Sequence, residues 1–367
     1  MKLVVLGLSL SSSWGNGHAT TFRGLLAEFA ARGHDILFLE RDVPWYASQR
    51  DLTDPDYCRL EYYRDLHDLQ RFSGEIASAD AVILGSYVPE GVDVGRFVQQ
   101  TARGVTAFYD IDTPVTLAKL ARGDFEYLDP SLIPGFDLYL SFTGGPTLRF
   151  IERDLGSPAA RALYCQADPE LYRPLEVPTR WDLSYLGTWS ADRQPTVDKL
   201  LCAAARALPE SRFCVAGPQY PSDIDWPANV ERIEHVPPAE HPVFYAASRF
   251  TLNVTRADMI AAGWSPSVRL FEAAMCGCPV ISDVWEGLDQ LFEPGREILL
   301  ARSTDDVIAA LSGIPPRNAR AIGEAARQRA LREHTSRVRA AELEQHLEEA
   351  MVGKRVAALA TGTMSGE

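Results

Sequence analysis

Residues 265–283 (SPSVRLFEAAMCGCPVISD) combine a helix start, an arginine and a glutamate in one short stretch. Pro266 and Ser267 open a predicted helix, and Arg269 falls in its first turn. The free N–H groups of a helix start and a guanidinium both favour bound phosphate. Glu272, one turn further on, carries a carboxylate that can accept two ribose hydroxyls. The stretch therefore predicts a diphosphate site followed by a ribose site.

A second candidate site lies near the start of the chain, between an apolar stretch and a helix. Gly15, Asn16 and Gly17 form a glycine loop that permits close backbone approach to a ligand. His18 follows at the start of the predicted helix. A neutral imidazole can act as a general base towards an acceptor hydroxyl. A structural or capping histidine is the alternative.

The same loop allows a nicotinamide-dinucleotide site as an alternative. Glu40 stands where such a site places its ribose-binding acid, but Thr20 occupies the position of the third glycine. The loop is also longer than that motif, so we do not favour this interpretation.

Two carboxylates follow a buried apolar stretch in the sequence FYDIDTP. Asp110 and Asp112 have the spacing of strand residues that point to one side, so we expect both to serve acceptor binding or base catalysis. No third carboxylate is close enough in sequence for a metal site. The alternative is a helix cap, with Thr113 as N-cap before Pro114.

Two series of apolar stretches, spaced by helical patterns, surround these residues. Apolar strands without alternation indicate parallel sheets that are covered on both faces. A proline-rich segment without periodicity separates the two series. The expected strands are 3–6, 35–40, 81–84, 105–109 and 138–141, then 183–186, 213–216, 230–233, 250–254 and 280–282.

The chain is therefore predicted to be an α/β protein with two doubly wound, Rossmann-like domains that face a central cleft. Open sheets of this kind bind ligands at the carboxyl ends of their strands. We expect an acceptor-binding domain over 1–167 and a donor-binding domain over 181–334, joined by a linker. The linker is 168–180, a C-terminal helix over 335–352 returns to the first domain, and 353–367 form a disordered tail.

Several motifs, in order, resemble the CgeB-like (spore-maturation type) glycosyltransferases of the GT-B fold, and the resemblance spans nearly the whole chain. They are GNGH, FLERDVPWY, FYDIDTP, YLGTWSADRQP and SVRLFEAAMCGCPVISD. The resemblance implies transfer of a sugar from a nucleoside-diphosphate sugar to an acceptor hydroxyl. It implies diphosphate contacts at Gly187, Thr188 and Arg193, base contacts at His235 and Val236, and a ribose contact at Glu272.

Two further expectations concern the chemistry. Without a metal, the charge on the departing diphosphate must be met by Arg193, Arg269 and Arg256 together with helix N–H groups. Many retaining relatives carry a second glutamate eight residues before the one at 272, but Trp264 stands there. The stereochemical course therefore cannot be transferred from them.

Composition limits the partners. The formal net charge of −14 argues against nucleic acid and anionic membranes, and no apolar run is long enough for a membrane span. The start lacks a signal-peptide cleavage site, which predicts a cytoplasmic protein. No cofactor or metal is expected. The acceptor is a small molecule or a glycan, and the oligomeric state is not predicted. A sugar-nucleotide epimerase and a catalytically silent nucleotide-sugar-binding protein remain alternatives.

Overall fold

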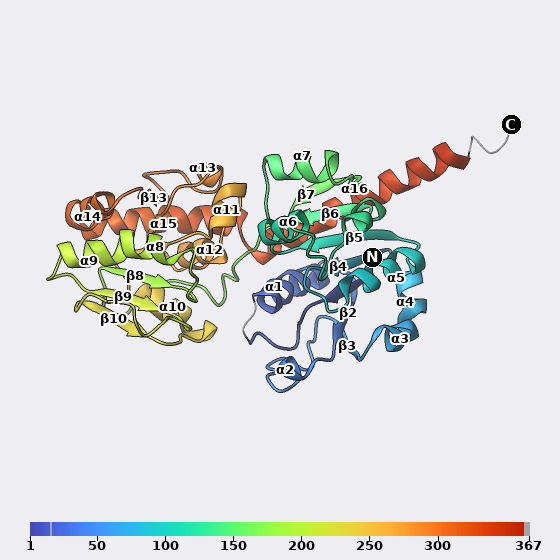
Figure 1. Cartoon of the computed structure of the whole chain (residues 1–367), viewed down its shortest axis with the longest axis horizontal. Coiled ribbons are helices and arrows are strands. Elements are labelled where there is room, and N and C mark those ends of the chain that lie inside the picture. Colours follow the sequence, from blue (N-terminus) through green and yellow to red (C-terminus); the bar gives the residue numbers. More distant parts are fainter. Residues whose placement is uncertain (15–16, 363–367) are drawn as a thin grey trace. The chain divides into compact units, whose positions relative to one another are not determined.

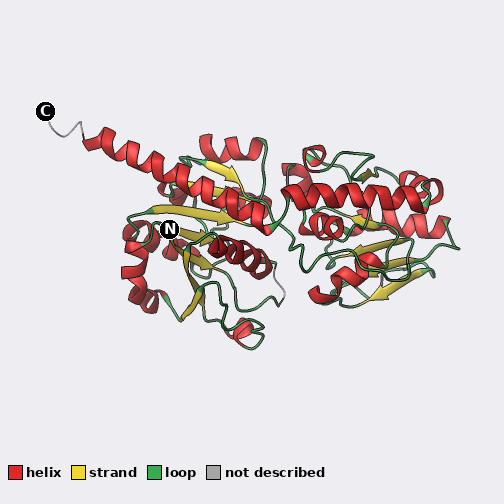
Figure 2. Ribbon diagram, turned by 180° about the vertical axis from the view of Figure 1, so that it is seen from behind, coloured by secondary structure: helices red, strands yellow, loops and turns green. Residues whose placement is uncertain are grey.

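The computed structural model describes residues 1–14 and 17–362 (Figure 1). The chain forms two compact units. The first unit consists of Met1–Cys165 and Ser336–Glu367, and the second unit is Gln166–Thr335. Each unit contains a parallel sheet with helices against it (Figure 2).

The sheet of the first unit has seven strands in the order β3-β2-β1-β4-β5-β6-β7, and every neighbouring pair is parallel. Its central strands are buried along both faces, which is why their sequences are apolar without alternation. The strands are β1 (Lys2–Gly7), β2 (Asp35–Arg41), β3 (Arg59–Tyr63), β4 (Ala81–Gly85), β5 (Val105–Asp110), β6 (Leu138–Ser141) and β7 (Ala160–Ala162).

Helices cover both faces of this sheet. Leu25 and Phe29 of α1 and Leu343 of α16 share one buried cluster with the sheet, and α1 packs against α16. A second cluster lies on the other face and includes Val98 of α5. The helices are α1 (His18–Ala31), α2 (Pro44–Ala47), α3 (Leu66–Leu69), α4 (Ser73–Ser78), α5 (Gly91–Thr101), α6 (Thr113–Ala121), α7 (Pro146–Arg153) and α16 (Ser336–Gly362).

The second unit repeats this plan with six parallel strands in the order β10-β9-β8-β11-β12-β13. Its strands are β8 (Leu183–Leu186), β9 (Phe213–Ala216), β10 (Val230–Ile233), β11 (Thr251–Asn253), β12 (Val280–Ser282) and β13 (Leu299–Leu300). Its helices are α8 (Gln194–Val197), α9 (Ala203–Ala207), α10 (His241–Ala246), α11 (Ala257–Ala262), α12 (Val268–Met275), α13 (Leu288–Leu291), α14 (Thr304–Gly313) and α15 (Pro316–Glu333). A π-helical turn over Asp198–Cys202 joins α8 to α9.

The C-terminal segment differs from the expectation. We expected a disordered tail from residue 353, but α16 continues to Gly362. Lys354 explains part of this extension, because its ammonium group binds the Gly104 carbonyl (2.7 Å) and the Asp137 carboxylate (2.8 Å). The helix is thereby tied to the first unit about two turns beyond its buried Leu347. Within the described residues, no helix is long and apolar enough to span a membrane.

Candidate functional site

Arg269 is the most enclosed positive group at the carboxyl edge of the second sheet. It lies in the first turn of α12 and is only 8% exposed. Its Nε donates to the carbonyl of Leu186 at the end of β8, and its Nη1 donates to Asn253 Oδ1 at the end of β11 (3.1 Å). Both partners are neutral, so the guanidinium keeps its full charge at this edge.

Two further arginines face the same region. Arg193 donates from Nη2 to the Thr188 carbonyl (2.7 Å) and from Nε to Ser190 Oγ (2.8 Å). Burial lowers the pKa of Arg193, and the positive charges of Arg269 and Arg256 lower it further. Among the residues that the structure describes, no carboxylate lies within ion-pair distance of Arg193 or Arg269, while Arg256 lies 4.0 Å from Asp192. This concentration of positive charge favours the binding of an anion.

Gly187 lies where the loop after β8 passes these guanidiniums. A Cβ atom at this position would lie 2.7 Å from Arg269 Nη2 and 2.8 Å from the hydroxyl of Tyr185. That hydroxyl is buried and has no hydrogen-bond partner among the described residues. An unsatisfied buried hydroxyl costs stability, so the Tyr185 hydroxyl beside the Arg269 guanidinium makes this a candidate ligand site.

The start of α12 completes this group. Ser267 is the N-cap residue, but its hydroxyl donates to Asn253 Oδ1 (2.8 Å) and caps no helix N–H group. The amides of the first turn are thus left without a side-chain cap, as an anion site requires. The structure therefore brings Gly187, Thr188, Arg193, Ser267 and Arg269 together at one edge of the second sheet.

Glu272 lies one turn along α12 and is 7% exposed. Its Oε1 accepts a hydrogen bond from the Tyr172 hydroxyl (2.8 Å), and its Oε2 accepts one from the Tyr245 hydroxyl (3.2 Å). Burial alone would raise the pKa of Glu272, but the hydrogen bond and charge of His241, with help from Tyr172 and Arg269, overcome this and lower it. The group is an ionised carboxylate whose Oε1 keeps a lone pair for a further donor, while Oε2 faces both Tyr245 and His241.

His241, at the start of α10, connects Glu272 with the expected base-binding segment. Its Nε2 lies 3.2 Å from the Val236 carbonyl, and its Nδ1 lies 3.7 Å from Glu272 Oε2. Val236 is buried, whereas His235 is exposed. Sequence reasoning missed His241, because nothing in the local pattern distinguishes it from an ordinary helix-starting histidine.

The side chain of His18 is almost completely buried. Its side chain is 7% exposed, and its Nε2 lies 3.2 Å from Asp112 Oδ2, whose side chain is 41% exposed. Its Nδ1 is buried with no hydrogen-bond partner among the described residues. The edge of the Tyr87 ring packs against the imidazole, with the ring centroids 5.6 Å apart. The histidine and Asp112 thus form a pair in which the carboxylate meets solvent.

The expectation that Asp110 and Asp112 point to one side was wrong. Asp110 ends β5 and is fully buried, where it accepts hydrogen bonds from Thr116 (2.6 Å) and Tyr139 (2.6 Å). Burial raises the pKa of Asp110 to about 6. The chain leaves the strand after this residue, so the alternation of strand side chains no longer applies at Asp112, which is itself the N-cap of α6. Asp110 is a structural group.

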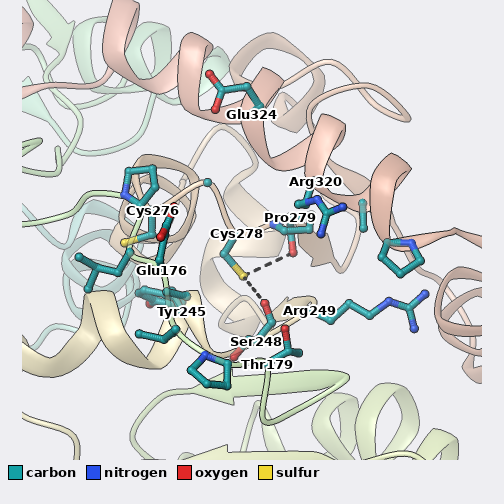
Figure 3. A pocket seen from close by; sticks show the side chains of 18 residues that line it. Glu176, Thr179, Tyr245, Ser248, Arg249, Cys276, Cys278, Pro279, Arg320 and Glu324 are labelled. Carbon is teal, nitrogen blue, oxygen red and sulfur yellow. Dashed lines mark hydrogen bonds between the residues drawn. The ribbon is translucent and has the colours of Figure 1, made fainter.

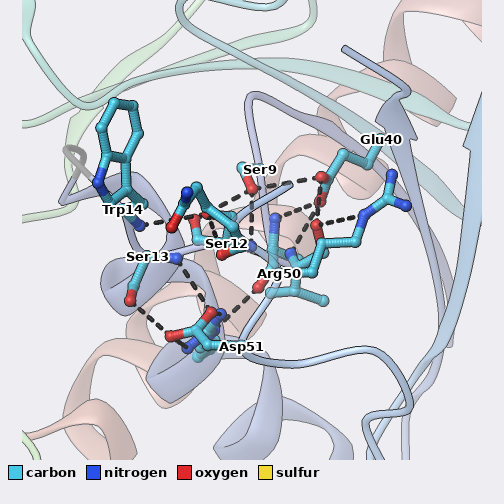
Figure 4. A network of polar contacts seen from close by, with 11 residues as sticks. Ser9, Ser12, Ser13, Trp14, Glu40, Arg50 and Asp51 are labelled. Carbon is cyan, nitrogen blue, oxygen red and sulfur yellow. Dashed lines mark hydrogen bonds and ion pairs between the residues drawn. The ribbon is translucent and has the colours of Figure 1, made fainter. Parts of the chain in front are cut away.

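The loop after β1 is held by two acidic residues (Figure 4). Glu40 is fully buried and accepts hydrogen bonds from the backbone N–H groups of Leu10 (2.6 Å) and Ser11 (2.9 Å). Asp51 binds Ser13 and Arg23. Glu40 is therefore engaged by the loop itself, which removes the ribose acid of the nicotinamide alternative.

The structure describes only one residue of the expected glycine loop, Gly17. Gly15 and Asn16 are outside the described residues. Gly17 is the N-cap residue of α1, and its carbonyl accepts the N–H of Thr21 (3.1 Å). In the described part of the chain, no group of three or more His, Cys, Asp or Glu side chains is arranged to hold a metal ion.

A cavity of about 950 Å³ lies at the amino ends of the strands of the second sheet (Figure 3). Its lining includes Thr179, Arg249 and Pro279, which precede β8, β11 and β12. It therefore lies at the amino ends of the strands, away from Arg269.

Comparisons with known proteins agree with this architecture. Residues 193–345 match the family model described as glycosyl transferase-like. No curated protein matches the sequence significantly. Among solved structures, sucrose-phosphate synthase from Thermosynechococcus elongatus is similar at 16% identity and a TM-score of 0.70, covering 96% of this chain and 100% of its own. Anabaena HepE in complex with UDP and glucose has 14% identity and a TM-score of 0.70, with 95% and 100% covered.

A third structure, the glycosyltransferase AviGT4 involved in avilamycin A biosynthesis, has 15% identity and a TM-score of 0.59, covering 96% of this chain and 98% of its own. These likenesses extend over both units, whereas the family match lies mostly in the second. The prediction of two Rossmann-like domains is confirmed. The chain has the GT-B glycosyltransferase fold, and its second half matches a glycosyl transferase-like family.

Proposed function

We propose that this protein transfers a sugar from a nucleoside-diphosphate sugar to an acceptor hydroxyl, without a metal ion. The observation that carries the proposal is the guanidinium group of Arg269 beside Gly187 and an uncapped helix start, with Glu272 one turn further on. These groups match, in order, a diphosphate and a ribose. HepE has been crystallised with UDP-glucose, so a UDP-sugar is the first donor to test.

In the proposed reaction the bond between the anomeric carbon and the diphosphate oxygen breaks, and a bond from the acceptor oxygen to that carbon forms. The transition state has oxocarbenium character, and negative charge grows on the leaving diphosphate. Arg269, Arg193 and the amides at the start of α12 stabilise that charge. Each donor of this kind contributes on the order of 10² to 10³ in turnover.

The proton of the acceptor hydroxyl goes to the pair formed by His18 and Asp112. Asp112 is the solvent-exposed member, and His18 lies within hydrogen-bond distance of its Oδ2 (3.2 Å). Asp110 is excluded from this role by its burial. We expect His18→Ala and Asp112→Asn each to lower kcat by roughly 10²-fold or more while UDP affinity stays within about twofold. Normal turnover in both variants would remove the pair from the mechanism.

We also propose that the protein belongs to the CgeB-like group, that its acceptor is a small molecule or a glycan, and that it is cytoplasmic. The ordered motifs from GNGH to residues 265–283 support the first of these.

Calorimetric titration with UDP tests the donor site. Wild-type protein should bind UDP, and Glu272→Ala should weaken binding by about tenfold or more, because a charge-assisted hydrogen bond to ribose is lost. Glu324→Ala removes an exposed carboxylate of the same unit, on α15, and serves as the matched control. Equal UDP affinity in wild type and Glu272→Ala would contradict the site.

The epimerase alternative is separated by its products. An epimerase converts a nucleotide sugar that is incubated alone, so NMR would show a second sugar signal. A glycosyltransferase without acceptor gives at most slow release of UDP. A silent binding protein gives neither change.

A further inference from the structure

The carboxylate of Glu272 lies among aromatic side chains that come from two other segments of the second unit. Tyr172 precedes β8 by eleven residues, and His241 and Tyr245 belong to α10. The two tyrosine hydroxyls already satisfy one lone pair on each carboxylate oxygen, at 2.8 and 3.2 Å. These two bonds hold the carboxylate in place but leave its rotation about the Cγ–Cδ bond to be limited by a third neighbour.

His241 is the member of this group that also touches the expected base site. Its Nε2 faces the Val236 carbonyl, which can only accept, so this nitrogen carries a proton. Its Nδ1 lies 3.4 Å from the Tyr172 oxygen and 3.7 Å from Glu272 Oε2. One ring therefore contacts both the backbone that follows β10 and the carboxylate on α12.

We propose that His241 is a positioning residue of the donor site, which orients the ribose-binding carboxylate through Nδ1 and the base-binding backbone through Nε2. This inference rests on the proposed function. The ring itself need not touch the nucleotide. It would act through Glu272 on the ribose hydroxyls and through the Val236 peptide on the base.

The two contacts can be separated by substitution. The amide nitrogen of His241→Asn occupies a position close to Nδ1 and can keep the contact with Glu272. The amide nitrogen of His241→Gln reaches a position close to Nε2 and can keep the contact with the Val236 carbonyl. His241→Ala removes both. Val243→Ala, on the same short helix but at an exposed position, is the control for damage to α10.

The probes are UDP, 2′-deoxy-UDP and CDP, with dissociation constants from calorimetry. Wild type should bind UDP about 10- to 100-fold more tightly than 2′-deoxy-UDP, since a hydrogen bond to the carboxylate is lost. This ratio should fall below about threefold in His241→Ala and His241→Gln and persist in His241→Asn. Wild type should also bind UDP more tightly than CDP, because the backbone that His241 holds at Val236 contacts the base in the proposal. This preference should be lost in His241→Ala and His241→Asn and persist in His241→Gln.

A purely structural histidine would lower all affinities together and leave both ratios unchanged. Unchanged ratios in a folded His241→Ala variant, checked by its circular dichroism and unfolding midpoint, therefore overturn the inference. Failure of wild type to bind UDP overturns the proposed function together with it. Binding of UDP by wild type with no preference over 2′-deoxy-UDP retains a donor site but removes the ribose role of Glu272, and with it the role of His241.

Discussion

Replacing Arg269 by lysine tests the diphosphate site most directly. A guanidinium has five N–H donors, and two of them bind the Leu186 carbonyl and the Asn253 side chain. Three remain, and Nη2 lies beside Gly187 at the open end of β8. Lysine keeps the charge but supplies one compact ammonium, which cannot hold both protein partners and a diphosphate oxygen. We expect kcat for sugar transfer to fall by about 10²- to 10³-fold, equivalent to about 2.7 to 4 kcal/mol.

The assay is the initial rate of the slow UDP release from a saturating UDP-sugar with water as the acceptor, which breaks the same bond to the diphosphate, together with UDP binding by calorimetry. Arg206→Lys, at an exposed arginine of the same unit that pairs with Asp225, is the matched control and should keep normal turnover. Arg269→Met should lose at least as much activity as the lysine variant. Turnover of Arg269→Lys within about threefold of wild type would show that the guanidinium does not meet the leaving diphosphate.

Three further predictions concern the packing around the two sites. Gly187→Ala places a Cβ atom 2.7 Å from Arg269 Nη2, so UDP affinity measured by calorimetry should fall by about tenfold, and unchanged affinity would contradict the close approach. Burial raises the pKa of Asp110 to about 6, so the native state binds the proton of this carboxyl more tightly than the unfolded state does. As the pH rises from about 4 to 6, ionisation of Asp110 should therefore lower the free energy of unfolding by about 3 kcal/mol. Asp110→Asn should flatten that part of the profile of urea unfolding free energy against pH, and an unaltered slope would refute the assignment. In Gly287→Ala the new Cβ atom would lie 2.4 Å from the Trp264 ring, at a residue whose φ is +90°. The free energy of unfolding in urea should therefore drop by roughly 2 to 4 kcal/mol. A loss below about 0.5 kcal/mol would show that the ring moves aside.

Part of the candidate nucleotide site was accessible from sequence because three of its groups lie on one continuous segment. Ser267, Arg269 and Glu272 are fixed relative to one another by helical geometry, and α12 begins and ends within one residue of the expected helix. The turn at Gly277 and the strand at 280–282 then follow from local rules. Short-range periodicity determines such arrangements.

The remaining features depend on contacts between distant segments. Tyr172 is 100 residues from the carboxylate that it binds, and no spacing rule predicts that pairing. Glu40 lies at the end of an apolar strand, as an accessible acid would, yet the loop at residues 9–11 folds over it. Asp110 and Asp112 share a spacing of two, but the strand ends between them. A sequence pattern predicts the element and cannot predict what packs on its end.

The six strands of the second sheet follow the order of the first six strands of the first sheet, but the carboxyl edges of the two sheets carry different charges. In the first unit the ends of β2 and β5 bear Glu40 and Asp110, both fully buried, and the exposed group nearby is the carboxylate of Asp112. In the second unit the corresponding edge carries Arg193, whose pKa is lowered by burial and by its arginine neighbours, together with the buried Arg269. A diphosphate would gain from the second arrangement and be repelled by the first. An acceptor hydroxyl needs a group that takes a proton, and the exposed Asp112 carboxylate beside His18 is such a group. The shared topology thus provides two similar edges, and the different side chains at their strand ends support the proposal that the nucleotide binds the second unit and the acceptor the first.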